Sequence, residues 1–524
     1  MPDVQVPAAP GDPVATVEGH DETRFRPAWR GDAVLFLVVG LGAVLRFWGI
    51  GDQSFWFDEW LTTEAVAGGP ADLARHVATR EGIAPPYFVV MWVWSRVVSD
   101  GEVALRSFSA LAGVVTVPVA YAIAVRLGQR RRVARAAALL VAANPLLVWY
   151  SQEARPYALL ALLGALSVLA AVEVDRTGRR ADVVRWGIVA AAAVAVHYFA
   201  LFVVAGEAVG LAARRRVPPR VLALGAGPVA LVLAALVPFA LEQHSHSTNR
   251  AWIAQFALTE RLEDAVRTAF AGPGARFAWL WLVPLVVTVA IGAVTLSRAG
   301  RRDRRVVGAL LLLAVAGVVP ALGAAAVGTD VLLGRYLLAA FVPLLVAAAA
   351  ALLSGRSFRL GAAAVLVIAG VWIGADVAVV RDPRLHRADW RAVADVVADD
   401  SSAHARVLVV DTNGGQSSPL HRYLPSATVL APGEAVTIDR IDVLVARPAG
   451  VPCNFYVGRA CGFVFLGGPL PESLADRFTL SERRELDQFV VERYQADDPV
   501  TLERDDLLAV PGDGAYVWVT PARR

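Results

Sequence analysis

Long apolar blocks alternate with short polar segments along the chain up to about residue 380. A helix needs about 20 mostly apolar residues to cross the hydrocarbon core of a bilayer. Eleven segments reach this length to within a few residues: 33–50, 103–126, 133–149, 156–174, 182–196, 198–213, 221–241, 277–297, 306–327, 334–353 and 358–380. The pattern therefore predicts a mainly α, polytopic transmembrane bundle of about 11 spans.

One further apolar segment, 85–99, is short, opens with two prolines and contains Arg96. The arginine clusters decide how to interpret it, because cytoplasmic loops carry an excess of basic residues. The clusters occur at 126–135, 176–185, 214–220, 298–305 and 356–359. If 85–99 crossed the membrane, all five would lie outside. We therefore predict that 85–99 is interfacial or re-entrant, with the N-terminus cytoplasmic and the C-terminus extracytoplasmic.

The domain organisation follows from the same pattern. Residues 1–32 are polar and rich in proline, and we expect a disordered cytoplasmic tail. Residues 33–380 form the transmembrane domain, with a first outer loop at 51–102. From Arg381 the composition becomes more polar, and residues 381–524 have the size of an extracytoplasmic α/β domain. Within this domain we expect a helix at Asp389–Asp399 and strands at Val407–Val410, Ile441–Val445 and Phe463–Leu466.

Composition narrows the class of protein. Of 524 residues, 56% are hydrophobic and 19% charged, and the mean hydropathy is +0.52. These values exclude a soluble enzyme, a disordered chain and a secreted disulfide framework. The two cysteines, Cys453 and Cys461, would lie outside the cell, where we predict a disulfide between them. The alternative is two free, buried thiols. The arginine runs are short and topological, so we expect no nucleic-acid partner.

The first chemical motif is the pair Asp58 and Glu59, which lies among aromatic residues just after the first span. Neighbouring helical residues point about 100° apart, so only one of the two carboxylates would face a given cavity. Such a carboxylate can act as a general base or hold a divalent cation. The alternative is an acidic helix start within an interfacial aromatic belt.

Two further motifs place arginine at the outer boundary. Tyr150–Tyr157 contains Glu153 and Arg155, and Gly334–Leu337 contains Arg335 and Tyr336. An arginine at this depth can bind a phosphate. The alternatives are a Glu153–Arg155 pair that fixes a short loop, and an Arg–Tyr pair that anchors a helix end.

Three histidines and one acidic residue within a predicted span are weaker indications of a functional site. His197 and Tyr198 interrupt an apolar stretch at an outer turn, where a structural role is an alternative. Glu207 lies within a span and stays unassigned, although ionisable residues there are often functional. His244 and His246 would supply two metal ligands, which is weak support for a metal site without a third.

Taken in order, these motifs resemble those of a known family. The ordered set is Asp58-Glu59, Pro85-Pro86-Tyr87, Ala104-Leu105-Arg106, Tyr150–Tyr157, His197-Tyr198-Phe199 and Gly334-Arg335-Tyr336. It resembles the GT-C superfamily of integral-membrane glycosyltransferases, in its bacterial mannosyltransferase-like (family 39-like) branch. That branch is similar to the protein O-mannosyltransferases and the lipid A aminoarabinose transferase. The resemblance covers about residues 33–380, with a looser match at Asp389-Trp390-Arg391.

The resemblance implies a reaction and a set of roles. The donor is a sugar on a polyprenyl phosphate at the outer leaflet, and Asp58, with Glu59 beside it, supplies the catalytic base for inverting transfer. Arg335, Tyr336 and Arg155 would bind the donor phosphate. Expected substrate contacts are Gln152, Glu153, Tyr157, Tyr87, His197, Tyr198 and Arg106. Many relatives carry Lys or His before the two prolines, where this chain has Ala84.

The sequence thus predicts a glycosyltransferase of a bacterial plasma membrane. The resemblance implies mannose as the default sugar, and arabinose, galactose or an amino sugar are the alternatives. The acceptor is an envelope glycan, glycolipid or protein, and a requirement for a divalent cation at Asp58, Glu59, His244 or His246 stays open. Two alternatives remain: a transporter or flippase of a lipid-linked saccharide, and a non-catalytic envelope scaffold.

Overall fold

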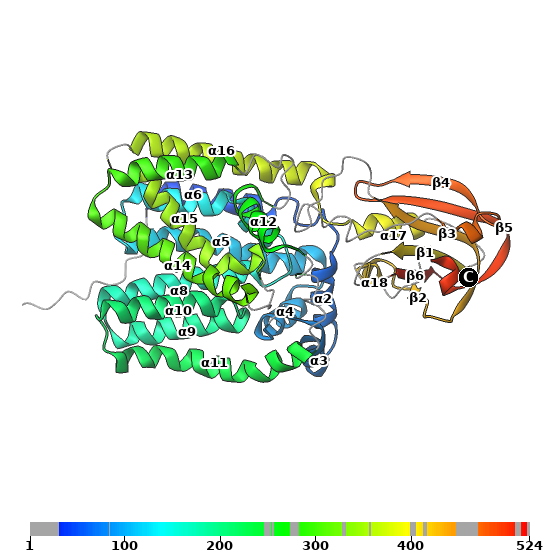
Figure 1. The fold of residues 1–524 in the computed structure, drawn as a ribbon, viewed down its shortest axis with the longest axis horizontal. Coiled ribbons are helices and arrows are strands. Elements are labelled where there is room, and N and C mark those ends of the chain that lie inside the picture. Colours follow the sequence, from blue (N-terminus) through cyan, green and yellow to red (C-terminus); the bar gives the residue numbers. More distant parts are fainter. Residues whose placement is uncertain are drawn as a thin grey trace, which may run out of the picture.

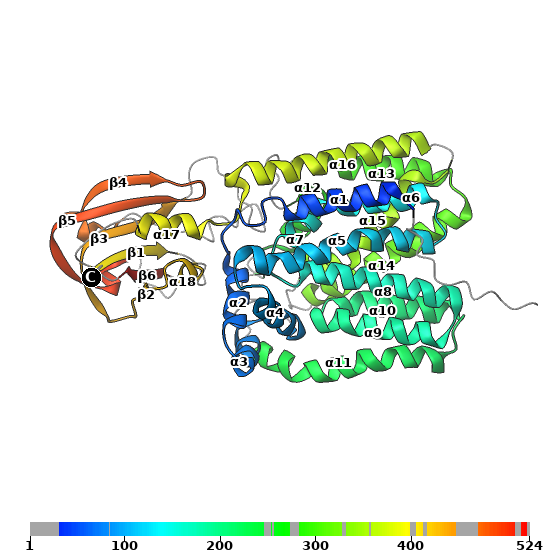
Figure 2. The ribbon, with the colours of Figure 1, turned by 180° about the vertical axis from the view of Figure 1, so that it is seen from behind.

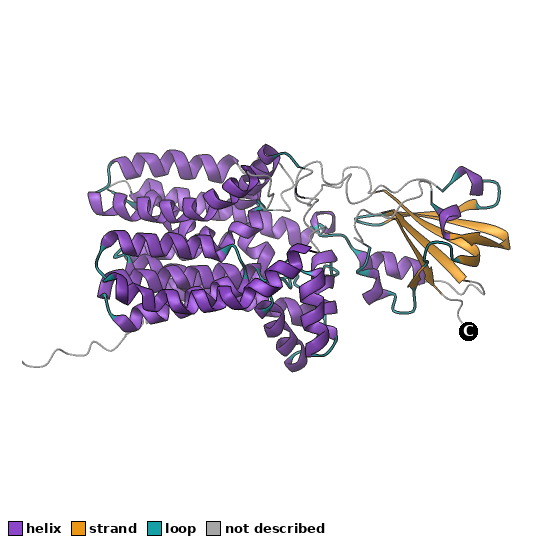
Figure 3. Cartoon of the chain, turned by 60° about the horizontal axis from the view of Figure 1, so that its bottom comes forward, coloured by secondary structure: helices purple, strands orange, loops and turns teal. Residues whose placement is uncertain are grey.

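The protein consists of a helical bundle and a smaller domain built on a β-sheet (Figures 1 and 2). This computed structural model describes residues 31–82, 84–245, 253, 256–272, 282–326, 332–355, 358–398, 405–411, 417–446, 470–508 and 515–520. Colouring by secondary structure shows that the bundle is helical and that the strands lie in the C-terminal domain (Figure 3).

The bundle is built from long apolar helices. These are α1 (Ala33–Phe47), α5 (Glu102–Arg126), α6 (Arg131–Ala143), α7 (Pro145–Ser151), α8 (Tyr157–Thr177), α9 (Arg180–Val196), α10 (Ala200–Arg214), α11 (Pro219–Ser245), α13 (Leu282–Ser297), α14 (Arg301–Ala326), α15 (Leu338–Leu353) and α16 (Phe358–Arg381). Each predicted span coincides with one of these helices or with the pair α6–α7. Among the described residues, six helices are long and apolar enough to cross a membrane, or seven if the bent pair α6–α7 counts as one span. The polytopic bundle is confirmed, and the count of 11 spans stays a prediction.

The predicted span 133–149 is not one straight helix. It breaks at Asn144-Pro145 into α6 and α7, which meet at 55°. Proline lacks an N–H, so carbonyls at the end of α6 lose their helical partners. Arg46 of α1 satisfies two of them, because its guanidinium donates to the carbonyls of Val141 (3.0 Å) and Ala142 (2.9 Å). A buried arginine thus makes a broken helix tolerable at membrane depth.

Three short helices lie at the end of the bundle next to the C-terminal domain (Figure 1). They are α2 (Phe57–Ala67), α3 (Pro70–Arg80) and α4 (Pro86–Val97). The 12 residues of α4 correspond to the predicted interfacial segment 85–99 and are fewer than a crossing needs. The 3₁₀ turn η3 (Gly334–Leu337) and α12 (Leu258–Ala271) lie in the same part of the fold and contact each other. We call this end of the bundle the site end.

The five arginine clusters gather at the opposite end, which we call the arginine end. Their loops contact one another through Arg126–Glu173, Gln129–Asp303, Arg214–Asp175 and the stacking of Arg132 on Phe358. Helices that alternate in direction bring these loops together, as a positive-inside pattern requires.

The C-terminal domain has a six-stranded mixed sheet in the order β2-β6-β1-β3-β5-β4. The strands are β1 (Ala405–Asp411), β2 (Thr428–Val429), β3 (Ala435–Ala446), β4 (Thr479–Glu485), β5 (Val490–Glu503) and β6 (Ala515–Thr520). Strands β1 and β3 are parallel, and the other pairs are antiparallel. Apolar cores cover both faces: Val407 and Val409 belong to one, and Leu408 and Val410 to the other. Two short helices, α17 (Trp390–Ala398) and α18 (Leu420–Tyr423), supply residues to the second core.

The predicted helix at 389–399 and the strands at 407–410 and 441–445 are found as α17, β1 and β3. The predicted strand at 463–466 and the predicted Cys453–Cys461 disulfide lie outside the described residues. Most of the predicted tail does as well. Its last residue, Asp32, is buried, caps α1 by accepting from the backbone N–H of Leu35, and pairs with Arg135.

Candidate active site

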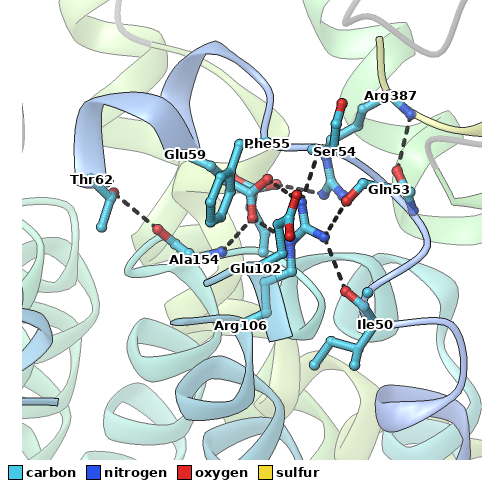
Figure 4. Close-up of polar contacts among 12 residues, drawn as sticks. Ile50, Gln53, Ser54, Phe55, Glu59, Thr62, Glu102, Arg106, Ala154 and Arg387 are labelled. Carbon is cyan, nitrogen blue, oxygen red and sulfur yellow. Dashed lines mark hydrogen bonds and ion pairs between the residues drawn. The ribbon is translucent and has the colours of Figure 1, made fainter. Parts of the chain in front are cut away.

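Asp58 and Glu59 open α2, and their side chains point to different partners, as their spacing on a helix requires. Asp58 Oδ2 lies 2.9 Å from Nη1 of Arg335, which the turn η3 contributes. Glu59 points into the bundle, where both of its oxygens accept hydrogen bonds from Arg106 at 2.7 and 2.8 Å. One oxygen also accepts from the backbone N–H of Ala154 at 2.9 Å (Figure 4).

Arg106 holds the loop that leads into α2. Besides Glu59, it donates to the carbonyls of Ile50, Gln53 and Ser54 at 2.7–3.0 Å (Figure 4). Five hydrogen bonds saturate its guanidinium. This geometry favours a structural role for Glu59 and Arg106 over the catalytic and substrate roles that the sequence predicted for them.

Arg155 pairs with a carboxylate that the sequence analysis did not identify. Its two terminal nitrogens donate to the two oxygens of Glu81 at 2.8 and 2.9 Å, and Nη1 also donates to the carbonyl of Asp58. Burial raises the pKa of Glu81, against the lowering effect of Arg155. The alternative of a Glu153–Arg155 pair is wrong, and a bidentate partner leaves Arg155 poorly suited to bind a phosphate.

Glu153 pairs instead with Arg387, from the segment that joins α16 to α17, at 2.7 Å. The Arg387 guanidinium lies 4.1 Å from the ring centroid of Trp149, and its backbone N–H donates to Gln53 Oε1 (Figure 4). Burial raises the pKa of Glu153 to about 7, with Arg387 as the main opposing influence. The C-terminal segment therefore contributes a cation to the site.

The four carboxylate–arginine pairs differ in exposure. The side chains of Glu59, Glu81 and Glu153 are at most 1% exposed, whereas that of Asp58 is 17% exposed. Asp58 is therefore the carboxylate of this group that a substrate can reach.

Aromatic side chains surround Arg335. Its guanidinium lies 5.4 Å from the ring of Tyr157 and 5.5 Å from that of Tyr336. Tyr336 packs against His197 (5.2 Å) and Phe199 (4.9 Å), so these predicted site residues do lie together. Burial, with Arg335 and Arg155 nearby, lowers the pKa of His197 to about 3, which keeps the ring neutral. Its Nδ1 accepts from the N–H of Phe199, and Nε2 has no partner among the described residues.

Other predicted substrate contacts are less central. Gln152 donates to the carbonyls of Leu45 and Trp48, which ties α7 to the end of α1. The hydroxyl of Tyr198 donates to Gln243. The hydroxyl of Tyr87 is buried without a partner in the described part of the chain, and it lies near enough to Arg155 and Glu153 to feel their charges.

The predicted metal ligands do not assemble. Glu59 is fully engaged by Arg106 and Ala154, so it is not free to share a cation with Asp58. His244 lies in the last turn of α11, and His246 lies outside the described residues. Across the described ranges there is no group of three His, Cys, Asp or Glu side chains arranged to hold a metal ion.

Comparison with known proteins gives a family match and a fold match. Residues 91–215, which include Arg106, Tyr150–Tyr157 and His197, match the family described as dolichyl-phosphate-mannose-protein mannosyltransferase. No curated protein matches the sequence significantly. Two solved structures of ArnT from Cupriavidus metallidurans each cover 88% of this chain. The apo form has 13% identity, a TM-score of 0.52 and 98% of its own length covered. The form bound to undecaprenyl phosphate has 12% identity, a TM-score of 0.50 and 97% of its own length covered.

A weaker likeness joins the chain to the protein O-mannosyltransferase complex Pmt1–Pmt2 of S. cerevisiae. It has 19% identity and a TM-score of 0.31 over 40% of this chain and 32% of that one, which is too low to support a conclusion. The ArnT likeness covers 88% of this chain, so it extends beyond the bundle, and it agrees with the resemblance noted in the sequence. The chain shares the fold of ArnT, and its residues 91–215 match the protein mannosyltransferase family.

Proposed function

We propose that the protein is a membrane glycosyltransferase that moves a sugar from a polyprenyl-phosphate donor to an acceptor hydroxyl. The observation that carries the proposal is the pair Asp58–Arg335: one reachable carboxylate 2.9 Å from a cation, at the end of a transmembrane bundle. The family match and the undecaprenyl phosphate bound by the ArnT relative support this class of donor.

The chemistry needs a base and a counter-charge for the leaving group. Asp58 takes the proton of the acceptor hydroxyl, and the resulting oxygen attacks the anomeric carbon of the sugar. A new C–O bond forms to the acceptor while the bond from the anomeric carbon to the phosphate oxygen breaks. The configuration inverts, and the polyprenyl phosphate leaves with the bonding electron pair. Arg335 stabilises the growing negative charge on the phosphate.

An exchange of partners would couple donor binding to base activation. Without substrate, Asp58 accepts one hydrogen bond from Arg335. A donor phosphate competes for this guanidinium and leaves the Asp58 carboxylate free to accept the proton of the acceptor. The neutral His197 ring lies against Tyr336, and its Nε2 has no partner among the described residues. It is placed to donate a hydrogen bond to the polyprenyl-phosphate sugar.

The two ends of the bundle support one orientation in the membrane. The arginine end carries the five basic clusters, so the positive-inside rule favours a cytoplasmic position for it. The site end, with Asp58 and the C-terminal domain, would then face the outside of a bacterial plasma membrane. This arrangement agrees with 11 crossings and an interfacial α4. Mannose is the default sugar by the name of the matching family, and the acceptor is an envelope glycan, glycolipid or protein.

The test is donor consumption by the purified chain in lipid, with a panel of polyprenyl-phosphate sugars and a crude envelope acceptor. We expect Asp58→Asn to fold normally and to lose on the order of 10²–10⁴ in rate, since the amide cannot act as a base. Asp72→Asn is the matched control, because Asp72 is an exposed acid on the neighbouring helix α3. Wild-type turnover by Asp58→Asn would refute the base assignment. Translocation of a lipid-linked saccharide without any transfer product would favour the transporter alternative.

A further inference from the structure

Two arginines and two carboxylates meet at the start of α2. Arg335 contacts the side chain of Asp58 at 2.9 Å, and Arg155 contacts the backbone carbonyl of the same residue at 3.0 Å. Glu81, directly after the last residue of α3, is the carboxylate that pairs with Arg155. We propose that Glu81 is a positioning residue, which keeps Arg155 on the Asp58 backbone and away from the Asp58 carboxylate. This role rests on the proposed function, in which that carboxylate is the base.

The Glu81–Arg155 pair is closed and buried. Nη1 and Nη2 of Arg155 donate to the two oxygens of Glu81 at 2.8 and 2.9 Å, and the side chains of Arg155 and Glu81 are 4% and 1% exposed. Two oxygens that each accept from one guanidinium are typical of an ionised carboxylate, and such a bidentate pair fixes the plane of the guanidinium. Glu81 therefore determines where the charge of Arg155 lies.

The same guanidinium also contacts the first turn of α2. Nη1 of Arg155 donates to the carbonyl of Asp58 at 3.0 Å and to the hydroxyl of Thr62, one turn further along, at 3.2 Å. Thr62 in turn donates to the carbonyl of Ala154 at 3.0 Å. These contacts hold α2 by its backbone and by a neutral hydroxyl, so the Asp58 side chain is left to Arg335.

The balance of charge explains why Glu81 is needed. Asp58 and Arg155 interact electrostatically, and the other two buried glutamates of the site each have an arginine partner of their own. Without the Glu81 charge, Arg155 would be drawn to the Asp58 carboxylate, because opposite charges attract strongly where water is excluded. A carboxylate that two arginines hold is a weaker base, since nearby cations favour its ionised form.

The exchange of partners proposed for donor binding depends on the same arrangement. A donor phosphate that takes Arg335 frees the Asp58 carboxylate only if no second cation replaces Arg335. With Glu81 in place, both terminal nitrogens of Arg155 are engaged. Glu81 thus allows the release of one arginine to activate the base.

The experiment compares Glu81→Gln with wild type, as the full chain in lipid nanodiscs. We expect kcat to fall roughly 10–100-fold, because the second arginine weakens the base. The affinity for undecaprenyl phosphate should rise roughly threefold or more, since Asp58 then competes less well for Arg335. A merely structural defect would lower both quantities, so a fall in phosphate affinity would overturn the proposal. Asp72→Asn, an exposed acid on α3, is the matched control and should change neither.

The double variant Glu81→Gln with Arg155→Gln separates charge from packing. It removes both charges of the buried pair, so we expect it to turn over faster than Glu81→Gln alone and to bind undecaprenyl phosphate like wild type. A double variant slower than Glu81→Gln would overturn the proposal. The binding measurement also serves if Glu81→Gln does not fold: a double variant with weakened phosphate binding would show that Arg155 binds the phosphate itself, which contradicts the role given to Glu81.

Failure of the proposed function gives a different result. Asp58→Asn tests the base by turnover, whereas a structure of Glu81→Gln in nanodiscs locates Arg155 without any turnover. In that variant we expect Arg155 within hydrogen-bond distance of the Asp58 carboxylate. An Arg155 that stays on the Asp58 carbonyl would overturn the role of Glu81 alone. An Arg155 that moves, together with wild-type turnover by Asp58→Asn, would refute the base assignment and confirm that Glu81 holds Arg155 in place.

Discussion

The two ends of the bundle use the same ion pairs in different surroundings. At the arginine end, Arg214 pairs with Asp175 while half of its side chain stays exposed. At the site end, Arg106 and Glu59 form a pair of the same chemistry that is almost completely buried. An exposed pair contributes about 0–1 kcal/mol, whereas removing one partner of a buried pair costs about 3–5 kcal/mol. We infer that arginine sets the topology at one end and holds the architecture together at the other.

Within the site end, the pair Asp58–Arg335 differs from the buried structural pairs. Glu59 and Glu81 each accept two hydrogen bonds from their arginine, but Asp58 accepts one from Arg335. The closed pairs fix the backbone around α2, and the open pair keeps its groups available. Rigid surroundings with one adaptable contact are what a preorganised site requires.

Breaking a closed pair should have the largest effect. Arg106→Ala leaves Glu59 buried without a cation and frees three loop carbonyls, so we expect a loss of about 3–5 kcal/mol in stability. Thermal unfolding and monodispersity of the purified chain would measure it. Arg75→Ala, which breaks an exposed pair on α3, is the matched control. If Arg106→Ala were as stable as that control, the structural role of the closed pairs would be wrong.

Removing the cation that comes from the C-terminal segment should have an intermediate effect that depends on pH. The pKa of Glu153 is raised to about 7 from 4.5, so the folded state binds this proton more tightly than the unfolded state. Its contribution to stability is complete below pH 4.5 and is lost as the pH rises through 7. Arg387→Gln removes the main influence that lowers this pKa, so the loss should continue to higher pH, with a further cost of about 1–3 kcal/mol.

Melting temperatures from pH 5 to 9 would test this prediction. Arg391→Gln is the control, because Arg391 pairs with Glu102 nearby but is 39% exposed. The double variant Glu153→Gln with Arg387→Gln should lose the added pH dependence. Identical profiles for wild type and Arg387→Gln would contradict the coupling between the two side chains.

The smallest effect is expected at the arginine end. Arg214→Ala should change stability by no more than about 1 kcal/mol, because both partners keep contact with solvent. Chemical denaturation in detergent would measure the change. A cost as large as that of Arg106→Ala would show that exposure does not separate the two ends.

Local sequence carried much of the fold. Apolar length predicted the positions of the long helices, and the short apolar run at 407–410 predicted a strand, because both signals depend on neighbours in the chain. Pro145 is a local signal for the break between α6 and α7. The span 133–149 was nevertheless predicted as one helix, because hydropathy does not depend on whether a residue has a backbone N–H.

Only part of the candidate site could be predicted from the sequence, for a physical reason. The carboxylate pair 58–59 and the arginine at 335 stand out locally, and helical geometry allows only one of the two acids to reach a given partner. Which acid would face Arg335 depends on the orientation of α2, and the partners Glu81 and Arg387 have no local signal of their own. Arg155 and Glu81 are 74 positions apart in the chain, and Arg387 and Glu153 are 234 apart. These pairs therefore depend on the tertiary fold.

The hydrogen bond between Gln53 and Arg387 spans 334 positions, and it has a consequence for how the protein is made. The loop before α2 emerges early from the ribosome, and Arg106 can bind it soon afterwards, yet Arg387 is synthesised only after all the helices of the bundle. Tyr423, whose hydroxyl accepts from the N–H of Phe55, emerges later still. A nascent chain thus inserts its helices while this loop is only partly held, and the remaining contacts form when Arg387 and Tyr423 arrive.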